Sequence, residues 1–335
     1  MQELMVILMY NIAIVGSTGL VGSTFLKIIE EYGVKINHLR LFASSKSRGK
    51  VIVFKDKEYI VEEITQGCFE GTDYALFSAG GAVSLKYAKQ AVDEGAIVID
   101  NSSAWRMDQQ VPLVVPEVNI EDAFNQKLIA NPNCSTIQVV LPLSPLEKTY
   151  GIESVSYTTY QAVSGSGING MKELEQTRLG EEASLYQYNI NETCIPQIDV
   201  FLEDGYTKEE QKMIDETKKI LHNDKIKINA TCVRVPIMNC HAVSVNVVLK
   251  EKYDLKDIYN LFNKQAGLIV KDDITNLIYP VATEARGTDG VYIGRIRKDK
   301  INENGILFYT VADNIRKGAA SNAVQIMTAL MKEVR

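Results

Sequence analysis

The sequence lacks the spacings of histidine and cysteine that are typical of metal sites and disulfide frameworks. It has three histidines, His38, His222 and His241, and none sits in a metal-ligand spacing. Its five cysteines are dispersed and include no CxxC pair: Cys68, Cys134, Cys194, Cys232 and Cys240. An odd, scattered set is typical of a reducing compartment. The sequence therefore predicts a cytoplasmic protein without a metal ion.

The sequence also lacks a cation-rich stripe and a long apolar run. Its 36 Lys and Arg residues against 42 Asp and Glu give a net charge of −6, which argues against nucleic acid as the main partner but leaves room for a small anionic ligand. The apolar start "MQELMVILMY" has no basic region or cleavage site and is too short to span a bilayer. We expect residues 1–10 to be a short extension before the first strand, and we expect no membrane partner.

The 335 residues are enough for two domains, and the two parts of the chain differ in pattern. Up to about residue 130, buried strand patterns alternate with helical ones, which predicts a Rossmann-type, doubly wound parallel sheet. The expected strands and strand-to-loop units are 11–16, 39–44, 73–81 and 96–103, and the expected helices are 20–32 and 83–95. Ligands of such sheets bind at the carboxyl ends of the strands.

From residue 151 onward the sequence is rich in β-branched and aromatic residues. The β-rich segments are 153–163, 231–250, 290–300 and 305–315. They predict an α+β domain with a large, mostly antiparallel or mixed sheet. Thr207 and Glu210 form a possible capping box at the start of a helix over 207–222, and a last helix over 317–334 could return to the first domain. We expect an NADP-binding domain of residues 1–133 plus 315–335 and a catalytic and dimerisation domain of residues 134–314.

A glycine-rich turn follows the first strand in "VGSTGLVG". Gly16, Gly19 and Gly22 match G-x-x-G-x-x-G rather than G-x-G-x-x-G, but glycines before a helix let the backbone approach a pyrophosphate in the same way. The second strand ends in "ASSKSRGK", where Ser44, Lys46 and Ser47 stand and the acid of NAD-binding folds is missing. Hydroxyls and cations suit a 2′-phosphate, so the sequence favours NADP(H).

Cys134 lies in "ANPNCSTIQVV", between a turn and a run with helical spacing that Pro142 limits or kinks. A thiol at a helix N-terminus is pushed toward the thiolate, although from position alone a packing role is as good an interpretation. His241 is the best candidate for a base, because His38 and His222 lie in a turn and at a helix end. Neighbouring side chains on a strand point to opposite faces, so Cys240 is expected to pack rather than pair with His241. A break between Arg234 and His241 would let both face one cleft.

Several polar residues remain open to two interpretations. Arg106 follows a strand end near the expected nicotinamide. Glu216 and Lys219 lie on adjacent turns of one helix, where a solvated, ion-paired surface is the simpler interpretation. Gln161, Ser164 and Gly165 lie where a strand ends in a glycine-rich loop, which either contacts the nicotinamide or only turns the chain.

A set of motifs, in order over about residues 11–330, resembles the bacterial aspartate-β-semialdehyde dehydrogenases. The motifs are "VGSTGLVG", "FSAGG", "VIDNSSAWR", "VPLVVPEVN", "NPNCSTIQ", "YQAVSGSG", "ETKKI", "CVRVP…H" and "GRIRKD…VADNIRKGAASN". The resemblance implies a homodimer or dimer of dimers. It also implies NADP-dependent, phosphate-dependent interconversion of 4-phospho-L-aspartate and L-aspartate-4-semialdehyde, in lysine, threonine, methionine and diaminopimelate biosynthesis.

The resemblance also implies roles for individual residues. Cys134 would be the thioester nucleophile and His241 the general acid/base. Gln161 would position the acyl intermediate, Arg234 would bind the substrate carboxylate and Glu216 its α-amino group. Inorganic phosphate would be bound by Arg106, Asn133 and Lys219. The positions implied for NADP(H) are Gly16, Thr18, Gly19, Leu20, Val21, Ser44, Lys46, Ser47, Ser164, Gly165 and Asn314. The family often has Arg where this chain has Lys46, with Arg48 nearby.

Two other functions are compatible with parts of this pattern. N-acetyl-γ-glutamyl-phosphate reductase uses the same cysteine, histidine and NADPH chemistry, but an acylated amine should not need a carboxylate such as Glu216. A non-catalytic NADP-binding protein would keep the fold, but it would have no need for Cys134 and His241 together.

Overall fold

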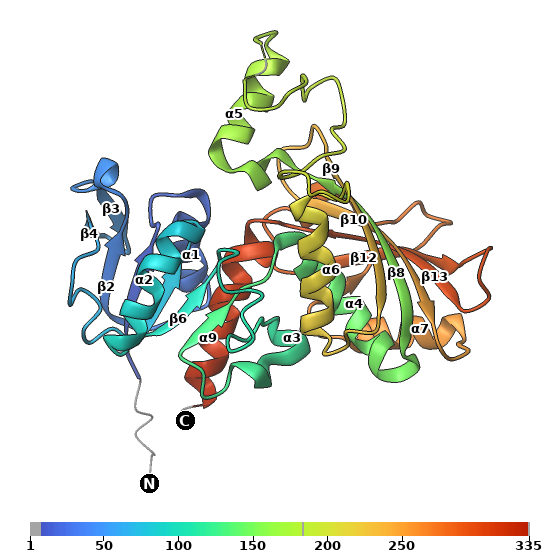
Figure 1. Cartoon of the computed structure of the whole chain (residues 1–335), viewed down its shortest axis with the longest axis horizontal. Helices are drawn as coiled ribbons and strands as arrows, with labels where there is room; N and C mark the ends of the chain where they lie inside the picture. The colour runs from blue at the N-terminus through green and yellow to red at the C-terminus, as the bar shows by residue number, and fades with distance from the viewer. Residues whose placement is uncertain (1–7, 183, 334–335) are drawn as a thin grey trace. The chain divides into compact units, whose positions relative to one another are not determined.

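The chain folds into two units, each built around one β-sheet, in the computed structural model, which describes residues 8–182 and 184–333 (Figure 1). The first unit comprises the chain up to Pro116, Ile120–Asn131 and the chain from Ala320 onward. The second comprises Glu117–Asn119 and Pro132–Ala319. The extension predicted for residues 1–10 lies mostly outside the described residues.

The sheet of the first unit has the strand order β3-β4-β2-β1-β5-β6-β7. Its strands are β1 (Tyr10–Val15), β2 (Ile36–Phe42), β3 (Val51–Phe54), β4 (Lys57–Glu62), β5 (Tyr74–Phe77), β6 (Ile97–Asp100) and β7 (Leu128–Ala130). All neighbouring strands are parallel except β3 and β4, which form an antiparallel hairpin at one edge. The predicted doubly wound parallel sheet is confirmed. The hairpin was not predicted.

The strand order of this sheet reverses at β1, whose neighbours are β2 on one side and β5 on the other. In doubly wound sheets, ligands bind beyond the carboxyl ends of the strands at such a reversal. The helices of the unit are α1 (Leu20–Glu31), η1 (Ser45–Ser47), α2 (Gly81–Asp93), η2 (Ile120–Ala123) and α9 (Ser321–Glu333), and the short α3 (Pro116–Asn119) contains the division between the units. Apolar residues of α1 and α9 belong to one core cluster.

The sheet of the second unit has the order β11-β12-β13-β10-β8-β9. Its strands are β8 (Ile152–Gln161), β9 (Lys227–Arg234), β10 (His241–Leu249), β11 (Leu268–Val270), β12 (Val291–Lys298) and β13 (Gly305–Ala312). Three neighbouring pairs are antiparallel, whereas β8–β9 and β11–β12 are parallel. The predicted mixed sheet is therefore confirmed.

Helices cover one face of this second sheet (Figure 1). The helices of the unit are α4 (Cys134–Tyr150), η3 (Val163–Ser166), α5 (Gly167–Arg178), α6 (Lys208–Ile220), α7 (Leu255–Lys264), α8 (Ala282–Ala285) and the π-helical turn η4 (Arg316–Ala320). Alternate residues of β10, from His241 to Leu249, are buried under α4, α6 and α7, while the residues between them are half-buried on the other face. Within the described residues, no helix has the length and apolarity needed to cross a membrane.

Two local predictions differ from the structure. The segment 231–250 is two separate strands, β9 and β10, which lie on either side of β8 and are joined by residues 235–240. Pro142 does not limit the helix after Cys134, since α4 continues through Pro142 and Pro145 to Tyr150. A proline inside a helix costs about 3 kcal/mol. Burying apolar side chains such as Leu143 and Leu146 returns about 1.5–3 kcal/mol each, which offsets that cost.

Candidate active site

Three neighbouring strands bring three of the predicted site residues to one level of the second sheet. His241 at the start of β10 is paired with Gln161 at the end of β8, and Gln161 is paired with Arg234 at the end of β9. Because directly paired residues project to the same face of a sheet, all three side chains point to the face that the helices cover. The break expected between Arg234 and His241 is the connection 235–240, which joins two different strands, β9 and β10.

His241 is fully buried, and its ring has a defined orientation. Its Nδ1 accepts a hydrogen bond of 3.0 Å from the backbone N–H of Ala162, while Nε2 is buried and has no hydrogen-bond partner within residues 8–182 and 184–333. A neutral ring in this position therefore carries its proton on Nε2. Burial, and to a smaller extent the charge of Arg234, together lower the pKa of His241 to about 3.

Gly165 is needed beside these side chains. A Cβ at this position would lie 2.7 Å from Nη1 of Arg234 and 3.2 Å from Nε2 of His241. Arg234 is held by a hydrogen bond of 2.7 Å from Nη1 to the carbonyl oxygen of Ala162. The arrangement places a cation and an imidazole N–H next to a residue with no side chain.

Cys134 is the first residue of α4, and the structure confirms its predicted place at a helix N-terminus. Asn133 caps the helix, since its Oδ1 accepts a hydrogen bond of 2.9 Å from the N–H of Ser135. Gly318 of η4 lies against Cys134, because a Cβ on Gly318 would be 2.9 Å from the Cys134 Cβ. The N–H groups and the dipole of a helix N-terminus favour a negatively charged sulfur at such a position.

The other cysteines differ from Cys134 in burial. Cys68, Cys232 and Cys240 are buried, which confirms the predicted packing role of Cys240. Burial raises the pKa of the Cys240 thiol to about 12 and also raises the pKa values of Cys68 and Cys232. Cys134 is half-buried and Cys194 is exposed. A thiol must be reachable to act as a nucleophile, and Cys134 meets that condition next to a helix terminus.

Helix α6 brings two buried carboxylates to the start of α4. Glu216 Oε2 accepts a hydrogen bond of 2.7 Å from the backbone N–H of Asn133. Glu209 Oε1 accepts hydrogen bonds from the amide groups of both Asn133, at 2.9 Å, and Gln161, at 3.1 Å. Glu216 is thus not part of a solvated surface, whereas Lys219, one turn further along α6, is half-buried.

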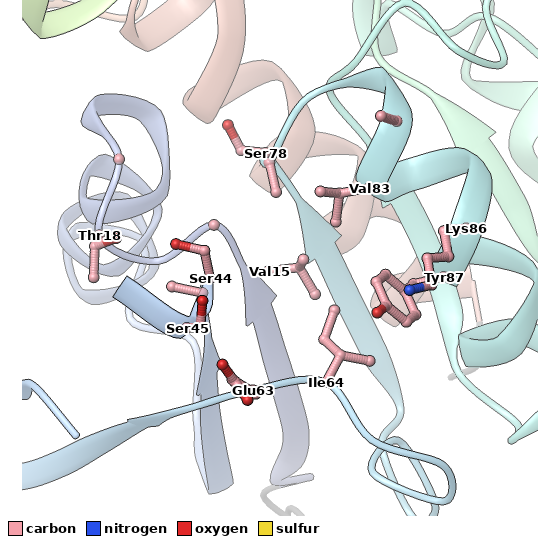
Figure 2. Close-up of a pocket in the computed structure, with 15 residues that line it drawn as sticks. Val15, Thr18, Ser44, Ser45, Glu63, Ile64, Ser78, Val83, Lys86 and Tyr87 are labelled. Atoms are coloured by element: carbon pink, nitrogen blue, oxygen red, sulfur yellow. The ribbon is translucent and has the colours of Figure 1, made fainter. Parts of the chain in front are cut away.

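The first unit contains a cavity of about 780 Å³ at the strand-order reversal (Figure 2). Figure 2 shows Thr18, Ser44, Ser45 and Glu63 on one side and Val83, Lys86 and Tyr87 of α2 on the other. Of the predicted cofactor positions, Gly16, Thr18, Gly19 and Ser44 line it, while Leu20, Val21, Lys46 and Ser47 do not. Lys46 is exposed in η1, and Ser47 is buried and accepts a hydrogen bond of 3.4 Å from Thr18 Oγ1.

The glycines of the first turn fit this cavity for steric reasons. Gly16 has a φ of +87°, and a Cβ there would lie 2.4 Å from the carbonyl oxygen of Ser78. A Cβ on Gly22 would lie 2.0 Å from the carbonyl oxygen of Gly16. The strand, turn and helix therefore pack too closely for side chains, as a dinucleotide-binding turn requires, so the residues present fit a dinucleotide.

The remaining predicted residues lie in different units. Ser164, Gly165 and Asn314 belong to the second unit, where the Ser164 Oγ and the Asn314 amide are 3.0–3.1 Å apart. Arg106 belongs to the first unit and is buried, donating to the carbonyl oxygens of Asn131 and Asn101. Asn133 and Lys219 belong to the second unit, so a joint phosphate site with Arg106 stays a prediction.

Sequence reasoning missed Glu209, Glu63, Tyr87 and Gly318. Glu209 had a usable signal: it lies seven residues before Glu216 on one helix and therefore on the same face. Glu63 had a weaker signal, because it follows the strand of a hairpin that was not predicted. Gly318 gave no signal, since its contact with Cys134 joins residues far apart in the chain.

The sheet topology, the glycine turn and the buried histidine define a dinucleotide-dependent dehydrogenase, and comparisons with known proteins agree with that class. Residues 11–126 match the family described as semialdehyde dehydrogenase, NAD binding domain, and residues 143–317 match semialdehyde dehydrogenase, dimerisation domain. The chain is 49% identical to aspartate-semialdehyde dehydrogenase of Aquifex aeolicus, over 97% of this chain and 98% of that protein.

Solved structures agree with the sequence comparison. The chain is similar to aspartate semialdehyde dehydrogenase II of Vibrio cholerae, with a TM-score of 0.93, 41% identity, and coverage of 97% of this chain and 99% of that one. The same protein complexed with ASA gives a TM-score of 0.92 at the same identity and coverage. The chain belongs to the aspartate-semialdehyde dehydrogenase family.

Proposed function

We propose that Cys134 and His241 carry the family's reaction in this chain, the reversible and phosphate-dependent conversion of L-aspartate-4-semialdehyde to 4-phospho-L-aspartate with NADP⁺. The observation that carries the proposal is that Cys134 lies at the start of α4, close in the hydrogen-bond network to His241. Asn133, the residue before Cys134, and Gln161 both donate hydrogen bonds to Glu209. Gln161 is in turn paired with His241 and Arg234 at the strand ends. All of these residues lie in the second unit.

In the biosynthetic direction, the Cys134 thiolate displaces phosphate from 4-phospho-L-aspartate and forms a thioester. NADPH, when bound, supplies the hydride that reduces this acyl group. The Nε2–H of His241 donates a hydrogen bond to the oxygen that develops negative charge, and this charge returns to sulfur when the thiolate leaves. Covalent catalysis divides one difficult step into two easier ones, and loss of one such donor to a developing oxyanion typically costs about 10²–10³-fold in kcat.

We propose the substrate contacts from the charges of the same group. Arg234, held by Ala162, would bind the substrate carboxylate, and the buried Glu216 carboxylate would bind its α-amino group. Gln161 would position the acyl group. Arg106, Asn133 and Lys219 would bind phosphate before it attacks the thioester in the reverse direction, which lowers the entropic cost of that step.

NADP(H) would bind in the cavity of the first unit, with the pyrophosphate at the glycine turn before α1. Lys46 and Ser47 of η1 would contact the 2′-phosphate, beside Ser44 at the cavity, and Ser164, Gly165 and Asn314 would contribute from the second unit. The domain boundaries that we propose are 1–133 with 315–335 for NADP binding and 134–314 for catalysis and dimerisation. The two compact units support this division.

The chain would act as a homodimer or dimer of dimers in the cytoplasm. The face of the second sheet opposite α4, α6 and α7 supports the dimer, and the short α8 packs against part of this face. On it lie Tyr160 and Tyr309, with ring centroids 6.2 Å apart, and Tyr160 is 38% exposed. A partly uncovered sheet face that carries aromatic residues is typical of an interface between identical chains. The dispersed cysteines support a reducing location.

A spectrophotometric assay tests the proposed function. We expect reduction of NADP⁺ by L-aspartate-4-semialdehyde to depend on inorganic phosphate, and the rate with N-acetylglutamate semialdehyde to be much lower. A preference for the N-acetylated substrate would contradict the proposed role of Glu216. Binding of NADP⁺ without any phosphate-dependent reduction would contradict the enzymatic function.

A further inference from the structure

Glu209 lies at the start of α6, and its buried carboxylate accepts hydrogen bonds from several side chains. Its Oε1 accepts from Nδ2 of Asn133 at 2.9 Å and from Nε2 of Gln161 at 3.1 Å. Its Oε2 accepts from Lys212 at 3.2 Å. One side chain of α6 therefore contacts the residue before Cys134 and the residue paired with His241.

Each of the two amides is fixed at both of its ends. The Gln161 Oε1 accepts from the hydroxyl of Thr159 at 2.9 Å, while its Nε2 donates to Glu209. The Asn133 Oδ1 accepts from the N–H of Ser135, while its Nδ2 donates to Glu209. An amide that turned over would place its oxygen against the carboxylate oxygen of Glu209 and repel it. An ionised carboxylate accepts only, so it selects one orientation for both amides.

The charge of Glu209 is kept in this buried place by a neighbouring cation. Lys212, three residues along α6, contacts Glu209 and also Asp199 at 2.8 Å. Burial raises the pKa of Glu209, but Lys212 and the two amide donors outweigh burial, so the pKa lies below its ordinary value. Hydrogen bonds to an ionised group are roughly twice as strong as those between neutral groups, which suits a carboxylate that must hold two side chains.

We propose that Glu209 is a positioning residue for the thioester chemistry, because it sets the orientations of two side-chain amides. One is the amide of Asn133, the residue before Cys134, and the other is the amide of Gln161, which is paired with His241. The inference rests on the proposed function, since it concerns the geometry of that reaction. Glu209 itself need not touch the substrate, because it acts through the two amides.

The substitution Glu209→Gln tests the proposal with almost no change in size. The new amide would offer an N–H where the carboxylate accepted, so it would no longer select one orientation of Gln161 and Asn133. We expect kcat to fall by about 10²-fold, as a small misplacement of a positioned group does, while KM for the semialdehyde changes much less.

The adjacent Glu210→Gln variant is a matched control. Glu210 is also buried in the first turn of α6, but its carboxylate accepts from the N–H groups of Thr207, at 2.7 Å, and Cys232, at 2.9 Å. We expect this variant to lower the thermal midpoint of unfolding and to keep kcat near the wild-type value below that midpoint. An equal loss of kcat in both variants would overturn the proposal, because it would show a merely structural role.

A double-mutant cycle shows whether Glu209 acts through Gln161. In a Gln161→Ala background, Glu209→Gln should reduce kcat by a smaller factor than in the wild type, because one of its two targets is already gone. Fully multiplicative effects, or a wild-type kcat in Glu209→Gln, would overturn the inference while the proposed function stands. If the wild-type protein shows no phosphate-dependent reduction, the proposed function fails and the inference fails with it.

Discussion

His241 shows how position in the fold decides the chemistry of one residue. The ring is buried and accepts from Ala162 at Nδ1, while its Nε2 has no hydrogen-bond partner among the residues that the structure describes. Because the pKa is lowered to about 3, the ring is neutral at pH 7 and offers a hydrogen-bond donor at Nε2. An exposed histidine with an ordinary pKa of about 6.5 would be partly charged near neutrality.

The lowered pKa of His241 predicts a loss of stability in acid. The unfolded chain binds a proton at His241 from about pH 6.5 downward, whereas the folded chain does not until about pH 3. The free energy of unfolding of the wild type should therefore decrease relative to His241→Asn by up to about 1.4 kcal/mol for each pH unit between these limits. Urea unfolding of the wild type and of His241→Asn at pH 7 and pH 5 measures this difference in the free energy of unfolding. Parallel pH dependences would show that His241 is not buried in its neutral form.

At the scale of elements, the site depends on how helix starts and strand ends meet. Thr207 and Glu210 form the predicted capping box of α6, and this helix start places Glu209 and Glu216 against the start of α4. The start of α4 is in turn contacted by η4, a π-helical turn of the kind that is frequent at functional sites.

The contact between η4 and α4 predicts the effect of adding one methyl group. In Gly318→Ala the new Cβ would lie 2.9 Å from the Cβ of Cys134 and 3.3 Å from its Cα, which is too close for either element to stay in place. We expect the shift to cost about 1–3 kcal/mol of stability and to lower kcat by about 10²-fold. Binding of NADPH should be kept and serves as the control. A wild-type kcat would show that the position of Cys134 tolerates the displacement.

Elements with a strong local pattern were predictable from the sequence, and contacts between distant elements were not. The turn at Gly16, the helix start at Cys134 and the capping box at Thr207 each depend on residues close together in the chain. The parallel strands β8 and β9 enclose a long segment, so nothing local indicates that Arg234 lies next to Gln161. The edge hairpin β3–β4 buries only Phe54 and Val61 among its strand residues, which is a weak pattern, and it was not predicted.

At the scale of the whole molecule, the two faces of the second sheet differ, since α4, α6 and α7 cover one and the short α8 packs against part of the other. His241, Gln161 and Arg234 point to the face that α4, α6 and α7 cover, so the site does not compete with the proposed dimer for the same surface. The other face carries Tyr160 and Tyr309, which belong to β8 and β13.

The proposed dimer predicts the effect of a charge on that face. Tyr309→Glu should shift the protein from a dimer toward a monomer, because burying two uncompensated carboxylates at a symmetric interface is costly. Sedimentation velocity at several protein concentrations measures the distribution. A Lys250→Glu variant, at an exposed position just after β10, is the matched control and should remain dimeric. An unchanged dimer in Tyr309→Glu would place the interface elsewhere.

The central claim is that Cys134 holds the acyl group during turnover, and trapping that group tests the claim most directly. The protein is mixed with L-aspartate-4-semialdehyde and NADP⁺ without phosphate, and the reaction is quenched in acid. The protein is then digested, and the masses of its peptides are measured by mass spectrometry. We expect an acyl adduct on the peptide that contains Cys134, formed together with NADPH, and its loss when phosphate is added before the quench. An adduct on another cysteine, or turnover in Cys134→Ala, would contradict the account.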